Sequence, residues 1–313
     1  MRMRLPLKLL AALAAAALTG CTMSSDAPPA PAPAAGHGPD GLMNWADLTA
    51  RARPTGAIEI RYGTESMQVV DLWLPQGGGP HPTVLMVHGG CWQTEIADRR
   101  LMDWIAGDLR DRGIAVWNID YRGVDRDGGG YPGTFLDAAA AADALRAHAA
   151  QYRLDISKLV AVGHSAGGHL ALWLAGRPRL PAASPLRTGN PIPIRTVISL
   201  GGLPDLEEAA RPPGSGCGTE IVQRLTGGRF ADTSVPHLAP LGVRQVLVNG
   251  VQDRIIPVAY AEGYAAPMRA AGDDVRVRMI DRTGHVELVA PGTAAWLATV
   301  EEIERALGRR RRP

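Results

Sequence analysis

The chain has 313 residues, of which 46% are apolar and 20% are charged, so it can bury a sizeable core. Its formal net charge of +2 gives no electrostatic reason to expect a nucleic-acid partner. The sequence contains no His-x-x-x-His or Cys-x-x-Cys pair, no P-loop, and no Gly-x-Gly-x-x-Gly after a first strand, so we expect neither a metal nor a cofactor.

The amino-terminal residues 1–20 resemble an export signal. Basic residues precede an apolar stretch over residues 9–18, which is too short to span a bilayer. The stretch ends in Leu-Thr-Gly-Cys, which is similar to the lipobox of bacterial lipoproteins. We therefore expect a lipoprotein signal peptide, a lipid on Cys21, and an exported protein anchored in the bacterial envelope, with Thr22 favouring the outer membrane. An ordinary secretory signal with an incidental cysteine is the alternative.

Residues 21–41 are rich in Pro, Ala, Ser and Gly and predict a disordered tether. The foldable domain spans residues 42–308, where apolar strands alternate with helical segments, and this alternation favours a mostly parallel sheet flanked by helices. Residues 309–313 form a basic tail, for which a frayed, solvated end is a simpler interpretation than a contact with anionic lipid.

A buried strand is predicted at residues 83–87, and it leads into His-Gly-Gly-Cys-Trp. Acyl transfer needs backbone N–H groups aimed at the oxyanion, and glycines after an early strand let the backbone approach the substrate closely. Gly89 and Gly90 are therefore candidate oxyanion donors; the alternative is a plain glycine-rich turn. We expect His88 to organise this loop by hydrogen bonding.

The pocket walls have two candidates, Trp92 on this loop and Tyr131 before a long helix. The bulk of Trp92 favours a narrow pocket for short acyl groups or a stacked aryl acyl group. A further strand is predicted at residues 113–119. Helices are predicted at residues 96–112, 134–152, 258–271 and 294–307.

The stretch Gly-His-Ser-Ala-Gly at residues 163–167 lies between a predicted buried strand at residues 159–162 and a predicted helix. Gly-x-Ser-x-Gly in this context is the sequence form of a nucleophile elbow. The turn is so sharp that the residues two before and two after the serine must be tiny, and Ser165 should have a strained backbone. Ser165 is the candidate nucleophile, and Ala166, which follows it, is a candidate oxyanion donor.

A segment rich in Pro, Gly and polar residues, 204–240, follows a predicted strand at residues 196–200. We expect a lid or pocket wall there; an ordinary long surface loop is the alternative. Glycines around Cys217 would let it reach Cys91, and an exported protein meets an oxidising compartment. The two cysteines are therefore a possible disulfide across the active-site mouth, or else two separate buried thiols.

Two strands near the carboxyl terminus, predicted at residues 245–249 and 275–280, precede Asp253 and His285. The carboxyl ends of parallel strands meet at one edge of a sheet, where open α/β sheets assemble their sites. His285 is the candidate general base, and Asp253 is the candidate acid that orients it. The rival acids are Glu287, Asp281, Asp273 and Asp274.

These motifs together resemble the α/β-hydrolases of the His-Gly-Gly group, which includes carboxylesterases, feruloyl and acetyl-xylan esterase-like enzymes and kynurenine formamidase-like proteins. The resemblance covers residues 58–307, and Cys91 departs from the residue that many members carry. It implies an α/β-hydrolase fold with a short lid-like insertion. The implied functional residues are the triad Ser165, Asp253 and His285 and the oxyanion donors Gly89, Gly90 and Ala166.

The resemblance also implies a serine hydrolase that cleaves small-molecule esters of short acyl or aryl acyl groups without a cofactor. An amide hydrolase, either kynurenine formamidase-like or prolyl-oligopeptidase-like, is the first alternative because the same triad serves both leaving groups. Export and the lack of a propeller-length extra domain disfavour these two kinds. An inactive hydrolase-fold binding module is the second alternative, which the intact set of motifs disfavours.

Overall fold

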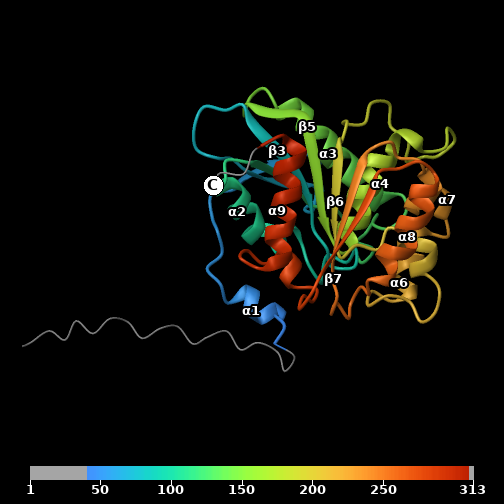
Figure 1. Ribbon diagram of the computed structural model, residues 1–313. Coiled ribbons are helices and arrows are strands. Elements are labelled where there is room, and N and C mark those ends of the chain that lie inside the picture. The colour runs from blue at the N-terminus through green and yellow to red at the C-terminus, as the bar shows by residue number, and fades with distance from the viewer. Residues whose placement is uncertain (1–40, 310–313) are drawn as a thin grey trace, which may run out of the picture. The chain divides into compact units, whose positions relative to one another are not determined.

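The computed structural model describes residues 41–309, which form an eight-stranded sheet flanked by helices (Figure 1). The predicted signal peptide, Cys21, nearly all of the tether and residues 310–313 lie outside the described residues. The strands are β1 (Ile58–Arg61), β2 (Val69–Trp73), β3 (His81–Val87), β4 (Ala115–Ile119), β5 (Leu154–His164), β6 (Thr196–Leu200), β7 (Arg244–Gly250) and β8 (Val275–Ile280).

The strand order is β1-β2-β4-β3-β5-β6-β7-β8, and every pair from β4 to β8 is parallel. β2 runs antiparallel to both β1 and β4. This antiparallel edge of the sheet was not predicted from the sequence. The central strands form because their runs of apolar residues are buried on both faces, as parallel sheets require. The mostly parallel sheet that the sequence predicted is confirmed.

Helices cover both faces of the sheet and bury two separate apolar cores. One core lies under α2 (Asp103–Asp111) and α9 (Ala294–Leu307). The other lies under α3 (Gly133–His148), α4 (Ala166–Gly176) and α8 (Ala259–Ala270). No helix within residues 41–309 is both long and apolar enough to cross a membrane.

The helix expected over residues 96–112 begins later than predicted. The carboxylate of Asp98 accepts the Arg100 N–H at 2.9 Å and caps a 3-10 turn, η1 (Arg99–Met102), which α2 then continues. Asp125 accepts the N–H groups of Thr94 and Glu95, which holds the residues before η1 in a loop. Side-chain capping therefore overrides the helical pattern of this stretch.

The insertion at residues 204–240 folds into short helices: α5 (Leu206–Ala209), α6 (Thr219–Thr226), α7 (Phe230–Thr233) and η3 (Val235–Leu238). It is fastened to α4 by two side chains. His169 Nε2 donates to the Thr233 carbonyl at 2.8 Å, and Trp173 Nε1 donates to the Asp232 carbonyl at 2.9 Å. Burial lowers the pKa of His169 to about 4, so its ring is neutral at pH 7 and keeps one donor and one acceptor. These contacts hold the insertion against α4 in this structure.

Candidate active site

The nucleophile elbow has the geometry that its sequence requires. Ser165 lies between β5 and α4 with φ 54° and ψ −124°, a strained conformation for a residue with a side chain. A Cβ placed on Gly163 would overlap the Gly167 carbonyl oxygen, and one placed on Gly167 would overlap the Val87 carbonyl oxygen. Only glycine fits at these two positions, which is the steric reason for the motif.

The structure brings Asp253 to the candidate base. His285 Nδ1 donates to Asp253 Oδ2 at 2.6 Å, and Asp253 Oδ1 accepts the N–H groups of Ile255 and Ile256, each at 2.9 Å. A Cβ on Gly201 would lie 3.1 Å from Asp253 Oδ2 and 3.3 Å from His285 Nδ1, so glycine is needed there too. With Nδ1 donating to the carboxylate, Nε2 of the neutral ring is left to accept a proton.

Two of the rival acids, Glu287 and Asp273, accept hydrogen bonds from backbone N–H groups. Glu287 accepts the N–H groups of Met43 and Gly284. Asp273 accepts those of Leu241 and Gly242. Each of these two carboxylates holds backbone N–H groups of a loop. Only Asp253 among the three is hydrogen-bonded to the His285 ring.

The candidate oxyanion loop lies directly beside the elbow. A Cβ on Gly89 would lie 3.0 Å from the Ser165 Cβ, so the backbone of this loop can come this close only with glycine. Gly90, Cys91 and Trp92 have φ values of 97°, 50° and 53°, three consecutive residues in the left-handed region. Ala166 is the first residue of α4, where a helix leaves its N–H groups without an intrahelical partner, as an oxyanion donor requires.

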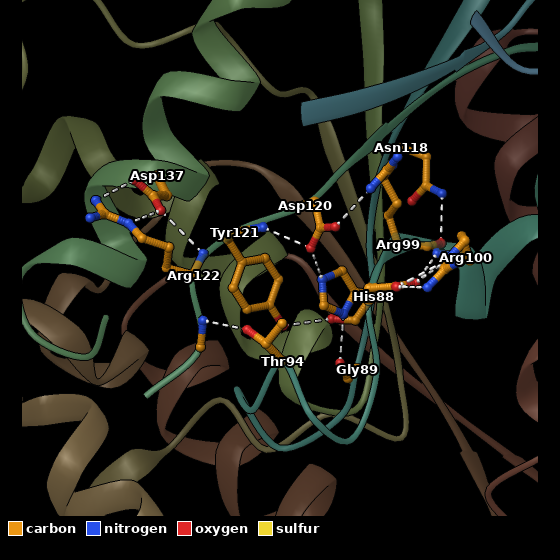
Figure 2. A network of polar contacts seen from close by, with 12 residues as sticks. His88, Gly89, Thr94, Arg99, Arg100, Asn118, Asp120, Tyr121, Arg122 and Asp137 are labelled. Atoms are coloured by element: carbon orange, nitrogen blue, oxygen red, sulfur yellow. Dashed lines mark hydrogen bonds and ion pairs between the residues drawn. The ribbon is translucent and has the colours of Figure 1, made fainter. Parts of the chain in front are cut away.

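A buried polar network holds the candidate oxyanion loop through His88 (Figure 2). His88 contacts the Gly89 carbonyl through Nδ1 at 2.7 Å and Asp120 Oδ1 through Nε2 at 3.0 Å. Its ring stacks on Tyr121 with centroids 4.3 Å apart, and the Tyr121 hydroxyl donates to the His88 carbonyl at 2.9 Å. Arg99 Nη1 donates to Asp120 Oδ2 at 3.1 Å. These contacts agree with the loop-organising role expected for His88.

Cys91 and Cys217 are joined by a disulfide, with Cα atoms 5.3 Å apart. The bond links the oxyanion loop to the insertion. One residue away, the Gly216 N–H donates to the Ile255 carbonyl at 2.9 Å, which connects the insertion to the loop that carries Asp253. The insertion therefore ties together two of the loops that form the site, and the disulfide is the pairing that the sequence left open.

The prediction that Trp92 forms a pocket wall is wrong for this structure. Its side chain is 0% exposed and packs edge-on against the His169 ring at 5.6 Å. The left-handed backbone at Cys91 and Trp92 turns the indole into the core. Tyr131 is partly buried and donates from its hydroxyl to Asp232 of the insertion at 3.0 Å, so its pocket role stays a prediction.

Two residues that sequence reasoning did not assign contact the candidate base. His164 Nε2 donates to the His285 carbonyl at 3.1 Å. Burial, and then the neighbouring His285, lower the pKa of His164 well below its usual value, so the ring is a neutral donor. Trp45, on the short helix α1 (Trp45–Thr49), packs edge-on against His285 with ring centroids 6.5 Å apart. No local motif signals either contact.

The arrangement as a whole suits acyl transfer: a strained serine at a helix start, a histidine oriented by a carboxylate, and backbone donors close by. Within residues 41–309, no group of three or more His, Cys, Asp or Glu side chains is arranged to hold a metal ion.

Several known proteins are similar to this chain in sequence. The BD-FAE family model matches residues 70–234, just over half of the chain. "Probable isoprenylcysteine alpha-carbonyl methylesterase ICMEL1" of Arabidopsis thaliana is 33% identical over 113 residues, covering 36% of this chain and 23% of that protein. "Probable isoprenylcysteine alpha-carbonyl methylesterase ICME" of Oryza sativa subsp. japonica is 25% identical over 250 residues, covering 73% and 58%. The chain thus spans less than two thirds of either relative.

Among solved structures, the esterase Est2 of Thermogutta terrifontis superposes with a TM-score of 0.67 at 22% identity, covering 84% of this chain and 96% of that one. The same esterase has been solved with propionate and with butyrate bound. Esterase B of Lactobacillus rhamnosis superposes with a TM-score of 0.68 at 19% identity, covering 81% and 84%. These likenesses confirm the predicted α/β-hydrolase fold.

Proposed function

Because the chain belongs to the BD-FAE family, we propose that it is a serine hydrolase of carboxylic esters. The observation that carries the proposal is the hydrogen-bonded pair Asp253–His285, which lies at the same edge of the sheet as the strained Ser165 and its glycine loop. The methylesterase names of the two plant relatives and the esterase names of the structural neighbours support an ester as the substrate.

The proposed reaction is acyl transfer by a serine triad. Ser165 Oγ attacks the acyl carbonyl while His285 Nε2 takes its proton, and Asp253 holds the ring and stabilises the imidazolium. Backbone N–H groups of the Gly89–Gly90 loop and of Ala166 stabilise the oxyanion. The alcohol leaves with the proton from His285, and water then attacks the acyl-enzyme in the reverse sequence, which returns the serine.

The favoured acyl group is short. Ser165 and His285 are only 2% and 6% exposed, so the reacting atoms lie below the surface. The longest helix of the insertion, α6, has 8 residues, so the insertion lacks the long apolar lid helix that a lipase uses to cover a fatty chain. Each methylene that fits contributes up to about 0.8 kcal/mol, but one that clashes costs more than it gains. The propionate and butyrate complexes of Est2 support the same size class.

We expect kcat/KM for p-nitrophenyl esters to be highest from acetyl to butyryl and to fall steeply by octanoyl, because longer chains have no room beside the nucleophile. Steady-state rates over the series measure this. Feruloyl, acetyl-xylan and N-formylkynurenine substrates belong in the same panel, since preferential hydrolysis of the formamide would favour the amide alternative. Activity that rises through decanoyl esters would contradict the small pocket.

The export signal and Cys21 support a second part of the proposal, that the mature protein is lipid-anchored in the bacterial envelope. Cys21→Ser removes the thiol that would be acylated, so the variant should carry no lipid and should leave the membrane fraction. Growth with a labelled fatty acid, followed by capture of the protein, measures the modification. Equal label in wild type and variant would argue against the anchor.

A further inference from the structure

We propose that residues 42–49, which we call the amino-terminal clamp, position the loop of the catalytic histidine. The inference rests on the proposed function and adds positioning residues to it. The clamp precedes the sheet in the chain and includes α1, yet it packs against the loop between β8 and α9 that carries His285. A shared carboxylate and an indole make the contacts that carry this inference.

The shared carboxylate is that of Glu287, in the 3-10 turn η4 (Glu287–Val289). Oε1 accepts the Met43 N–H at 2.6 Å, and Oε2 accepts the Gly284 N–H at 3.0 Å. Gly284 is the residue immediately before His285. The clamp is therefore joined through one buried side chain to the backbone that carries the base. A Cβ at Gly284 would lie 3.5 Å from Leu42 Cδ1, so the two segments are also in close contact.

The indole is that of Trp45. Its ring centroid is 6.5 Å from that of His285 and 6.1 Å from that of His164, edge-on in both cases. The two histidine rings are 4.4 Å apart, so the three rings form one cluster. Trp45 is itself 36% exposed and packs on the nearly buried His285, and an aromatic side chain is well suited to such a position, with one side packed and one in water.

The clamp is held together by its own hydrogen bonds. Asn44 and Asp47 form a reciprocal capping box at the start of α1. Just beyond the clamp, Arg51 Nη1 donates to the Pro291 carbonyl at 2.8 Å. Met43 within the clamp and Arg51 just after it are thus both hydrogen-bonded to the segment that follows β8.

His285 consequently has three independent restraints. Asp253 fixes Nδ1, His164 fixes the backbone carbonyl, and the clamp fixes the preceding residue and one side of the ring. The first two come from the sheet and its loops, whereas the third comes from a segment outside the sheet. Misplacement of a catalytic group by about 1 Å can cost about 10²-fold in rate, so a partial loss of restraint should reduce kcat more than it affects substrate binding.

The test compares three variants of the full chain: Trp45→Ala, Glu287→Gln, and Ile58→Ala as a control with similar exposure, 37%, on the edge strand β1. Glutamine keeps the volume of Glu287 but offers one acceptor oxygen in place of two, so one of the two N–H groups loses its partner. With p-nitrophenyl acetate we expect kcat to fall about tenfold in the first two variants, with KM within about twofold of wild type. The control should match wild type, and Trp45→Phe should recover most of the activity.

Phosphonylation by diisopropyl fluorophosphate, followed by mass spectrometry, separates the possible failures. If wild-type protein neither hydrolyses esters nor is labelled on Ser165, the proposed function fails and the clamp with it. If wild type is active but Trp45→Ala and Glu287→Gln keep kcat within twofold, only the clamp is overturned. A rise in KM with unchanged kcat would also overturn it, because Trp45 would then bind substrate. Melting temperatures within a few degrees of wild type show that the variants are folded.

Discussion

Ser165→Ala is expected to lower kcat by on the order of 10⁶, as loss of the nucleophile does in another triad enzyme. The fold should be retained, because the Ser165 side chain makes no capping hydrogen bond and the substitution deletes only one hydroxyl. Steady-state hydrolysis of p-nitrophenyl acetate measures the loss, and the melting temperature controls for folding.

His285→Ala should cause a similar loss, and Asp253→Asn should cost about 10⁴, because an amide stabilises the wrong tautomer of the histidine. A folded Ser165→Ala protein that retains more than a few per cent of wild-type activity would remove Ser165 from the mechanism.

Gly89→Ala should lower kcat by about 10²- to 10³-fold, which is the cost of losing one oxyanion donor. The new Cβ would lie 2.9 Å from His164 Nδ1 and 3.0 Å from the Ser165 Cβ. The loop must therefore move away from the nucleophile, and its N–H groups move with it. The measurement is kcat and KM on acetyl and butyryl esters.

Gly189→Ala is the matched control, because a Cβ there would meet no atom within 4 Å. It should leave kcat unchanged. If Gly89→Ala were as active as this control, the loop that follows β3 would not supply the oxyanion donors.

The regular elements could be predicted because their signals are local. β3, β5, β6 and β7 each contain a buried, mostly apolar run that a sheet covered on both faces can bury, whereas β8 alternates apolar residues with arginines at the edge of the sheet. The antiparallel strands β1 and β2 are short, with 4 and 5 residues, and their order depends on pairing: β2 pairs with β4, and β1 pairs with β2. The start of α2 was missed because Asp98, a side chain at the boundary, ends the preceding loop.

In the site, too, local motifs predicted some residues, and long-range packing decided others. The glycines of the elbow were predictable because Gly-x-Ser-x-Gly is a short motif, although the Val87 carbonyl oxygen that excludes a side chain at Gly167 lies on another strand. Whether Cys91 pairs with Cys217 and whether Trp92 faces substrate or core depend on how the insertion packs on α4, which the sequence around them does not encode.

The sequence by itself determined the fold class, the elbow at Ser165 and the glycine loop beside it, since apolar periodicity and close backbone approach leave a local pattern. Only the tertiary structure decided that Asp253, and neither Glu287 nor Asp273, orients His285, and that Trp45 packs against the same ring. The physical reason is that hydrogen bonds and ring contacts act over a few ångströms. These groups lie far apart in the chain and meet only when the strands bring their loops to one edge of the sheet.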